Sequence, residues 1–252
     1  MKPSNATKRT NSHAIVSPEE WLEARKVLLA REKELTRAHD EVARLRRELP
    51  WTKVTKSYRF DGLEGEEALG DLFAGRSQLI IQHFMLGPGW IEGCVGCSFT
   101  ADHVEGALYH QPHHDVSLVV VARAPLAEIQ AYQRRMGWRF KWVSSFRSDF
   151  NFDFQVSFRD EDRARGKVFH NYKEQDYLAD ELAGHSVFYR DPASGEIFHT
   201  YSTYNRGDEQ MIGTYHSLDI APKGRNETGP NSDLTDWVRH HDRYVETGNA
   251  AP

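Results

Sequence analysis

Apolar residues recur at every seventh position near the start of the chain, at Trp21, Leu28, Leu35, Val42 and Leu49. The preceding Ser17-Pro18-Glu19-Glu20 has the form of a helix start, with a serine N-cap, a proline in the first helical position and a glutamate that completes a capping box. Pro50 follows, where a helix would end. The pattern predicts one helix over residues 17–49, about 48 Å long at ~1.5 Å per residue.

The narrow apolar stripe of this helix leaves its role open. A two-stranded coiled coil uses two apolar columns, and here Arg31 and the small Ala24 and Ala38 interrupt the second one. The arm of residues 17–50 could join two copies of the chain in a homodimer, or it could lie on its own domain. Residues 1–16 are polar and predict a disordered leader.

From Trp51 onward the pattern changes to short strands that alternate with helices. Gln78–Leu86 and Val116–Ala122 are apolar runs of strand length, which predict buried strands. Ser98–Tyr109 and Pro125–Met136 have the spacing of helices. A β-α-β-α order indicates parallel strands in an α/β sheet.

Smaller elements complete this domain. Lys53–Phe60 predicts a strand and Glu66–Phe73 a short helix. Val187–Arg190 and Ile197–Thr203 predict two strands of a hairpin, because the residues between them, Asp191 to Gly195, are typical of turns. A hairpin adds antiparallel strands, so the predicted sheet is mixed.

These elements define the predicted domain organisation. Residues 51–220 form the main α/β domain, and residues 221–252 form a C-terminal loop and docking helix. That helix is expected over Leu234–Val245, with Trp237 and Tyr244 available to pack on the domain.

Charge and hydropathy exclude several classes of function. The net charge is −5 and the isoelectric point about 6.2, so the chain has no global basic field to attract nucleic acid or anionic membranes. The sequence contains neither an apolar run long enough to span a membrane nor the apolar core of a signal peptide after its polar start. We expect a cytoplasmic protein.

The chain has only two cysteines, Cys94 and Cys97, which follow a predicted strand and a glycine-containing loop at the start of a predicted helix. A disulfide between them would close almost none of the chain, so a structural bridge explains them poorly. The first turn of a helix favours a thiolate, because it presents free N–H groups and the positive end of the helix dipole. Cys94 is therefore the predicted attacking thiol, and Cys97 can resolve a mixed disulfide on it.

A zinc site is the main alternative at these cysteines, because the spacing Cys94-x2-Cys97-x12-His110-x3-His114 matches a zinc-finger pattern. The positions that would fill the small core of a finger are Ala101 and Ala107. A helix over 98–109 would also separate Cys97 from His110 by about 20 Å. Other metals at the histidines of residues 103–114 stay open, but solvated loop histidines are more common, and we expect no metal and no cofactor.

Six further residues are candidates for substrate binding: Trp90, Ser98, Asp102, Arg123, Trp142 and Ser145. Trp90 precedes the cysteines, and Asp102 lies on the following helix, where it could influence the thiol proton. Arg123 ends a strand parallel to the one that leads to Cys94, and could bind an anionic substrate. The polar positions between the aromatic residues of 138–158 could line a small-molecule cleft.

Four long segments resemble one known family: GCVGCSFTADH, RAPLAEIQAYQRRMGWRFKWVSSFRSDFNFDF, SVFYRD and IFHTYSTYNRG. They resemble the thioredoxin-like family catalogued as domain of unknown function 899, often labelled predicted dithiol-disulfide oxidoreductases, over roughly residues 17–245. The resemblance implies a thioredoxin-like, peroxiredoxin-branch α/β fold: a three-layer sandwich with a mixed sheet, here with a long N-terminal helix. The CxxC of the family falls on Cys94 and Cys97.

Two departures from the family pattern concern the site. Many members look like Cys-Pro-Ser-Cys, whereas Val95 and Gly96 stand between the cysteines here. Thioredoxins carry a proline in the loop that faces the active site, and the corresponding residues 181–186 contain none.

Three functions follow in order of preference. The first is thiol-disulfide exchange with a small-molecule or protein disulfide, with a cellular thiol as electron donor. The second is a thiol peroxidase with a sulfenic acid on Cys94, disfavoured because Ile91 stands where peroxiredoxins have a threonine. The third is a non-catalytic redox-sensing protein that binds a partner through its long helix.

Overall fold

A computed structural model describes residues 9–10 and 13–244, and the chain divides into two compact units, residues 1–50 and 51–252. In the first unit, β1 (Arg9–Thr10) pairs antiparallel with β2 (His13–Ala14). Residues 1–8 and 11–12 of the predicted leader lie outside the described residues.

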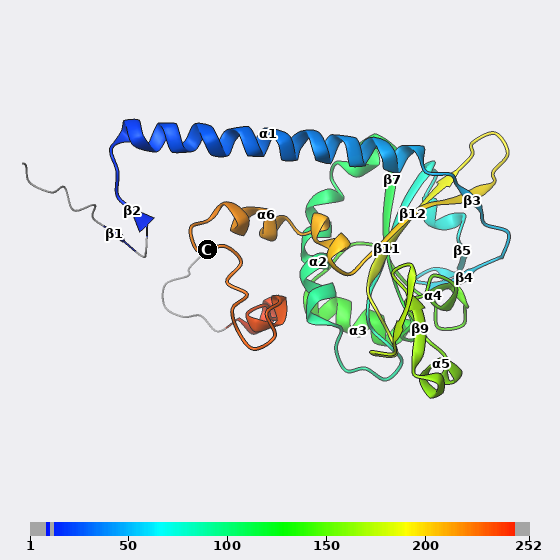
Figure 1. Cartoon of the computed structure of the whole chain (residues 1–252). Helices are drawn as coiled ribbons and strands as arrows, with labels where there is room; N and C mark the ends of the chain where they lie inside the picture. The colour runs from blue at the N-terminus through cyan, green and yellow to red at the C-terminus, as the bar shows by residue number, and fades with distance from the viewer. Residues whose placement is uncertain (1–8, 11–12, 245–252) are drawn as a thin grey trace, which may run out of the picture. The chain divides into compact units, whose positions relative to one another are not determined.

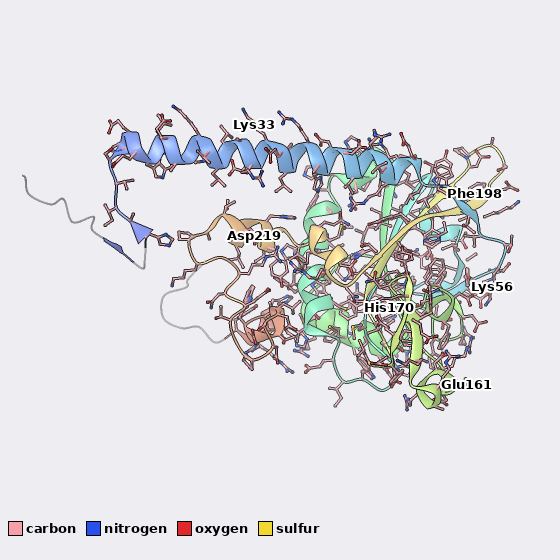
Figure 2. All side chains as sticks on the ribbon, viewed as in Figure 1. Lys33, Lys56, Glu161, His170, Phe198 and Asp219 are labelled. Atoms are coloured by element: carbon pink, nitrogen blue, oxygen red, sulfur yellow. The ribbon has the colours of Figure 1, made fainter. Side chains whose placement is uncertain are left out.

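The predicted N-terminal helix is confirmed as α1 (Pro18–Glu48). Its capping box is complete: the Glu20 N–H donates to Ser17 Oγ at 3.2 Å, and the Ser17 N–H donates to the Glu20 carboxylate at 3.0 Å. None of its residues is buried, and Figure 2 shows side chains, Lys33 among them, projecting along the whole helix. The stripe of apolar residues that predicts the helix is exposed.

The second unit is built on a mixed sheet of eight strands in the order β3-β12-β11-β6-β7-β8-β4-β5 (Figure 1). Their bounds are β3 (Thr52–Lys53), β4 (Arg59–Gly62), β5 (Gly65–Ala68), β6 (Gln78–His83), β7 (Val116–Ala122), β8 (Trp142–Ser144), β11 (Gly184–Arg190) and β12 (Ile197–Tyr204). β6, β7 and β8 run parallel, and the other neighbouring strands are antiparallel. A separate hairpin joins β9 (Lys167–His170) to β10 (Lys173–Asp176).

Helices and loops cover both faces of this sheet. α2 (Val95–Ala107) and α3 (Leu126–Met136) pack on the face that presents Leu118 and Val120 of β7. The short η1 (Asp71–Phe73) and α4 (Phe150–Asp153) pack on the face that presents Val119 and Val121. The apolar run of β7 thus supplies both cores, as expected for a central parallel strand.

These layers confirm the predicted three-layer, thioredoxin-like α/β arrangement: two parallel β-α-β units, β6-α2-β7 and β7-α3-β8, and the antiparallel hairpin β11-β12 beside β6. The remaining helices are η2 (Gln111–His114), α5 (Asp160–Arg165), η3 (Asn205–Met211), α6 (Gly213–Ile220), η4 (Leu234–Asp236) and η5 (His241–Arg243). Within residues 13–244, no helix has the length and apolar content needed to cross a bilayer.

Several predicted elements are wrong in detail. The segment 66–73 is not a helix, because Gly65, at φ +124°, closes the hairpin of β4 and β5 before the chain turns into η1. The strand expected over 53–60 is split between β3 and β4. The docking helix expected from Leu234 is two short turns, η4 and η5, with an extended link between them. Val245, its expected end, lies outside the described residues.

Candidate functional site

The chain enters the site through a tight loop between β6 and α2. The Cys94 N–H donates to the Met85 carbonyl at 3.0 Å, and Cys94 is the N-cap residue of α2. A side chain on Gly93 would lie 2.3 Å from the ring of Phe84, so only glycine lets the loop pass this close to the core. The predicted start of this helix is Ser98, whereas the N-cap of α2 is Cys94, four residues earlier. Both cysteines therefore lie in the first turn of α2.

Cys97 lies behind Cys94 and is 4% exposed. The Met85 N–H donates to Cys97 Sγ at 3.4 Å, and Gln82 Nε2 donates to the Cys97 carbonyl at 3.1 Å. Both cysteines are free thiols, and Cys94 is partly exposed.

The two thiols interact, and this interaction separates their pKa values. The hydrogen bond from Cys97 lowers the pKa of the Cys94 thiol to about 6, and the N–H groups of Gly96 and Cys97 act in the same direction against burial. The same hydrogen bond, together with burial and the nearby Cys94 charge, raises the pKa of the Cys97 thiol. At neutral pH the pair therefore consists of a partly exposed thiolate and a buried thiol that donates to it.

The first turn of α2 is fixed by hydrogen bonds to the cysteine backbone. Ser98 Oγ donates to the Cys94 carbonyl at 2.9 Å and lies 2.9 Å from the Tyr132 hydroxyl, which can donate to it. Tyr132 belongs to α3, so the second helix of this face holds the start of the first.

The C-terminal segment holds the cysteine loop from the other side. His240 is buried, and its Nε2 lies 3.0 Å from the Gly93 carbonyl, within hydrogen-bond distance. Arg135 and Arg243 bind the Glu92 carboxylate at 2.9 and 2.7 Å. Two segments more than 130 residues apart in sequence, 92–93 and 240–243, are therefore joined immediately before Cys94.

A pocket of about 360 Å³ opens onto both cysteines. Its walls come from the end of β6, the first turn of α2, the start of β11, η3, α6 and the loop 227–234. Ala183, Gly184 and His185 line it, so the proline-free segment 181–186 faces the cysteines as the family resemblance implies.

The predicted substrate-binding residues lie outside this pocket. Trp90 packs against the core cluster on the helical face of the sheet, and Ser98 acts on the cysteine backbone. Asp102 accepts a hydrogen bond from Trp138 Nε1 at 2.8 Å and contacts His241 at 2.7 Å.

The other three candidates also have structural partners. Arg123 is ion-paired at 2.6 Å with the buried Glu181, where burial raises the carboxyl pKa and the arginine opposes that rise. Ser145 is fully buried and donates to Asn151 Oδ1 at 2.8 Å. Trp142 lies in the core and borders a different pocket, of about 810 Å³, that contains neither cysteine.

The pocket instead gathers residues that the sequence did not single out, among them Gln82, His185, Asp208, Tyr215 and Glu227. Gln82 and His83 are adjacent polar residues in the buried half of β6, and this polar pair was the available signal for Gln82. Asp208 and Glu227 lie in loop-like segments, where nothing in the local pattern distinguishes them.

Metal ligation finds no support in the described part of the chain, which contains no group of three or more His, Cys, Asp or Glu side chains placed to hold an ion. α2 separates the residues of the zinc-finger pattern. The two cysteines lie at its start, whereas His110 precedes η2 and His114 is the last residue of η2, both beyond the end of α2.

The chain is similar to one family and, at low identity, to several solved structures. The model of the family described as "Bacterial protein of unknown function (DUF899)" matches residues 10–244. No curated protein matches. A cysteine variant of PrxQ from Xylella fastidiosa aligns at 10% identity and a TM-score of 0.43, over 66% of this chain and 94% of that one.

Two further structures are similar in the same range. The peroxidoxin BcpB from Mycobacterium tuberculosis aligns at 11% identity and a TM-score of 0.40, over 68% of this chain and 97% of that one. A candidate protein disulfide isomerase from Bacteroides thetaiotaomicron aligns at 14% identity and a TM-score of 0.35, over 69% and 95% of the two chains.

Proposed function

We propose, given that this chain belongs to the bacterial family of unknown function DUF899, that it is a thiol-disulfide oxidoreductase that works through Cys94 and Cys97. One observation carries the proposal: Cys94 stands at an uncapped helix N-terminus in a pocket that Cys97 also lines, and Cys97 is buried in the same helical turn. This arrangement supports a division of labour between an attacking and a resolving sulfur.

In the first step the Cys94 thiolate attacks one sulfur of a disulfide R–S–S–R. The Cys94–sulfur bond forms, the R–S–S–R bond breaks, and one R–S⁻ leaves. The Gly96 and Cys97 N–H groups stabilise the thiolate before attack.

In the second step Cys97 loses its proton, which ends on a leaving thiolate, and attacks Cys94 Sγ. The Cys94–Cys97 disulfide forms and the second R–S⁻ leaves, so two electrons pass from the protein to the substrate. A thiol electron donor must then reduce the protein disulfide, and the reducing cytoplasm is the compartment that suits this cycle.

We also propose that a second copy of the chain is a partner through α1. Apolar side chains of its heptad are 44–70% exposed, and an exposed apolar stripe on a long helix is expected to be covered. Sedimentation should give a dimer mass for the full chain and a lower mass for a Leu28→Glu, Leu35→Glu variant. A monomeric full chain would refute this.

Trapping tests the oxidoreductase proposal directly. Cys97→Ser should accumulate a mixed disulfide between Cys94 and its substrate, seen by mass spectrometry and released by dithiothreitol. Cys94→Ser, which keeps the other cysteine, is the matched control and should trap nothing. Equal labelling of the two variants would contradict the assigned roles.

The peroxidase alternative has less support. Arg206, which lines the pocket, is ion-paired with Glu209 at 2.7 Å, and Arg123 is held by Glu181 outside it. Both guanidinium groups are paired with carboxylates, and of the two only that of Arg206 lies at the pocket. The test compares the rates at which the protein reduces hydrogen peroxide and a disulfide with the same thiol donor. If hydrogen peroxide is reduced faster, the peroxidase becomes the preferred function.

A further inference from the structure

The C-terminal part of the chain forms one wall of the pocket that contains Cys94. Leu234 lies over Gly96, with its methyl groups 3.5 and 3.6 Å from where a Gly96 side chain would begin. η3 and the loop 227–234 form the outer walls of a pocket of about 360 Å³, which is in the size range of small-molecule sites. A protein substrate would have to bring its disulfide into this pocket to reach Cys94.

The walls of the pocket carry more negative than positive charge. Four carboxylates line it, those of Asp208, Glu209, Glu227 and Asp233, against the single guanidinium of Arg206. Glu209 is neutralised, because Arg206 and Arg225 both bind it at 2.7 Å. Arg225 also pairs with Asp219 on α6, which is labelled in Figure 2.

The other three carboxylates have no ion pair with Lys or Arg anywhere in the described residues. Asp208 contacts His185 Nδ1 at 2.9 Å. Glu227 accepts a hydrogen bond from the Tyr215 hydroxyl at 2.6 Å, and Asp233 accepts from the Thr235 hydroxyl at 2.6 Å. Their residual charge repels anions and attracts cations across a small, partly enclosed volume.

Three buried polar atoms of residues that line the pocket lack a hydrogen-bond partner: Gln82 Oε1, His83 Nδ1 and His185 Nε2. Gln82 is 2% exposed; its Nε2 donates to the Cys97 carbonyl, so its Oε1 is left unpaired. His185 is 4% exposed; its Nδ1 lies 2.9 Å from Asp208 Oδ1, and its Nε2 has no partner. Both residues line the pocket and face each other across β6 and β11. Gln82 Oε1 is an unpaired buried acceptor, so it favours a ligand that brings N–H or O–H groups.

From size, charge and hydrogen-bonding capacity together we propose that the substrates of this site are small disulfides with amino or other donor groups and no net negative charge. The inference rests on the proposed function, since it names the substrate class of the same two cysteines. The reaction is R–S–S–R plus the Cys94 thiolate and Cys97 thiol, giving the protein disulfide, R–S⁻ and R–SH.

A matched series of three disulfides tests charge at nearly constant size: cystamine, 2-hydroxyethyl disulfide and 3,3′-dithiodipropionate, which are dicationic, neutral and dianionic at pH 7. Each rate is divided by the rate of the same disulfide with free dithiothreitol, because leaving-group thiols differ in reactivity. We expect normalised kcat/KM to fall in that order, with at least a tenfold span at low salt that shrinks at high salt. Insulin, as a protein disulfide, should be reduced more slowly than cystamine.

Removing single carboxylate charges shows which side chains cause the preference for cationic disulfides. Glu227→Gln keeps an acceptor for Tyr215 and should lower the cystamine-to-dithiodipropionate ratio severalfold. Glu161→Gln, on the distant α5 and labelled in Figure 2, removes the same charge outside the pocket and should leave the ratio unchanged.

The outcomes separate this inference from the proposed function. If all three disulfides and insulin are reduced at equal normalised rates, or if insulin or the dianion is preferred, the substrate class is wrong although the oxidoreductase stands. If no disulfide is reduced and Cys97→Ser traps nothing, the proposed function itself fails.

Discussion

Helix α1 and helix α2 obtain their stability in opposite ways. α1 has 31 residues and buries none of them, and its support is local: a complete capping box and ion pairs such as Arg44 with Glu41 and Glu48. α2 has 13 residues, contains Gly96 and Gly106, and has no side-chain cap. It buries Cys97, Ser98, Phe99, Thr100, Ala101 and Val104, so packing holds it in place.

The difference explains why chemistry is expected at one helix start and not at the other. In α1 the Ser17 side chain occupies an N–H group of the first turn. In α2 the corresponding groups, including the N–H groups of Gly96 and Cys97, remain available to the Cys94 sulfur. A helix that is stabilised by tertiary packing can leave its N-terminus uncapped and use it to stabilise a thiolate.

The largest expected effect comes from replacing the N-cap residue of α2. Cys94→Ser should abolish disulfide reduction, on the order of 10³-fold or more, because the hydroxyl is a far weaker nucleophile at neutral pH. Serine is a good N-cap, so the thermal midpoint should be maintained or raised. Activity is measured with a small disulfide and a thiol donor, and unfolding by circular dichroism. Residual activity above a tenth of wild type would place the attacking group elsewhere.

The pH dependence of Cys94 is the next test. With a pKa of about 6, its alkylation rate should rise only about tenfold from pH 5 to 8, whereas an ordinary thiol would rise several hundredfold. Cys97→Ala removes the hydrogen bond that lowers the pKa and should move the profile toward that of the ordinary thiol. An unchanged profile in Cys97→Ala would show that the helix N-terminus alone is responsible.

The lowered pKa of Cys94 also makes the stability of the reduced protein depend on pH. The pKa of Cys94 is about 6 in the folded protein and about 9.0, the value of an ordinary thiol, in the unfolded chain, so the unfolded chain binds more protons between these values. The free energy of unfolding contributed by Cys94 therefore rises with pH from about 6 to 9, and it is lost as pH falls through 6. Cys94→Ser should lack this rise when both proteins are unfolded by urea across the range.

A pair of identical truncations compares the two helices directly. Val104 of α2 is 3% exposed and packs in the core, whereas Val42 of α1 is 44% exposed. Val104→Ala should lower the free energy of unfolding of the second unit by about 1–3 kcal/mol, through lost burial and a cavity. Val42→Ala should change the same free energy by less than about 0.5 kcal/mol, because α1 belongs to the other unit. An equal loss from the two variants would mean that α1 contributes to the stability of the second unit.

The two helices also show which features of the structure can be predicted from the sequence and which cannot. α1 and β7 follow from local signals, a capping box and an unbroken apolar run, and both were predicted closely. Cys94 and Cys97 were found because their residue type and spacing carry the chemistry. Asp208, Glu227 and His185 were missed, since the sheet and the C-terminal loop bring them to the pocket from distant positions. The partner of Arg123 could not be predicted for the same reason, because Glu181 is 58 residues away.

The smallest effect is expected at the N-cap of α1. Ser17→Ala removes the hydrogen bond from the Glu20 N–H and should cost about 1 kcal/mol, confined to the first turn of the helix. Faster amide hydrogen exchange at Glu20 and Trp21 would report the loss, while Ser17→Asp, which restores an acceptor, should reverse it. Disulfide reduction should stay at the wild-type rate, because no cap of α1 acts on the cysteines. A drop in activity with Ser17→Ala that Ser17→Asp restores would show that the two helices are coupled, and would remove the distinction drawn between them.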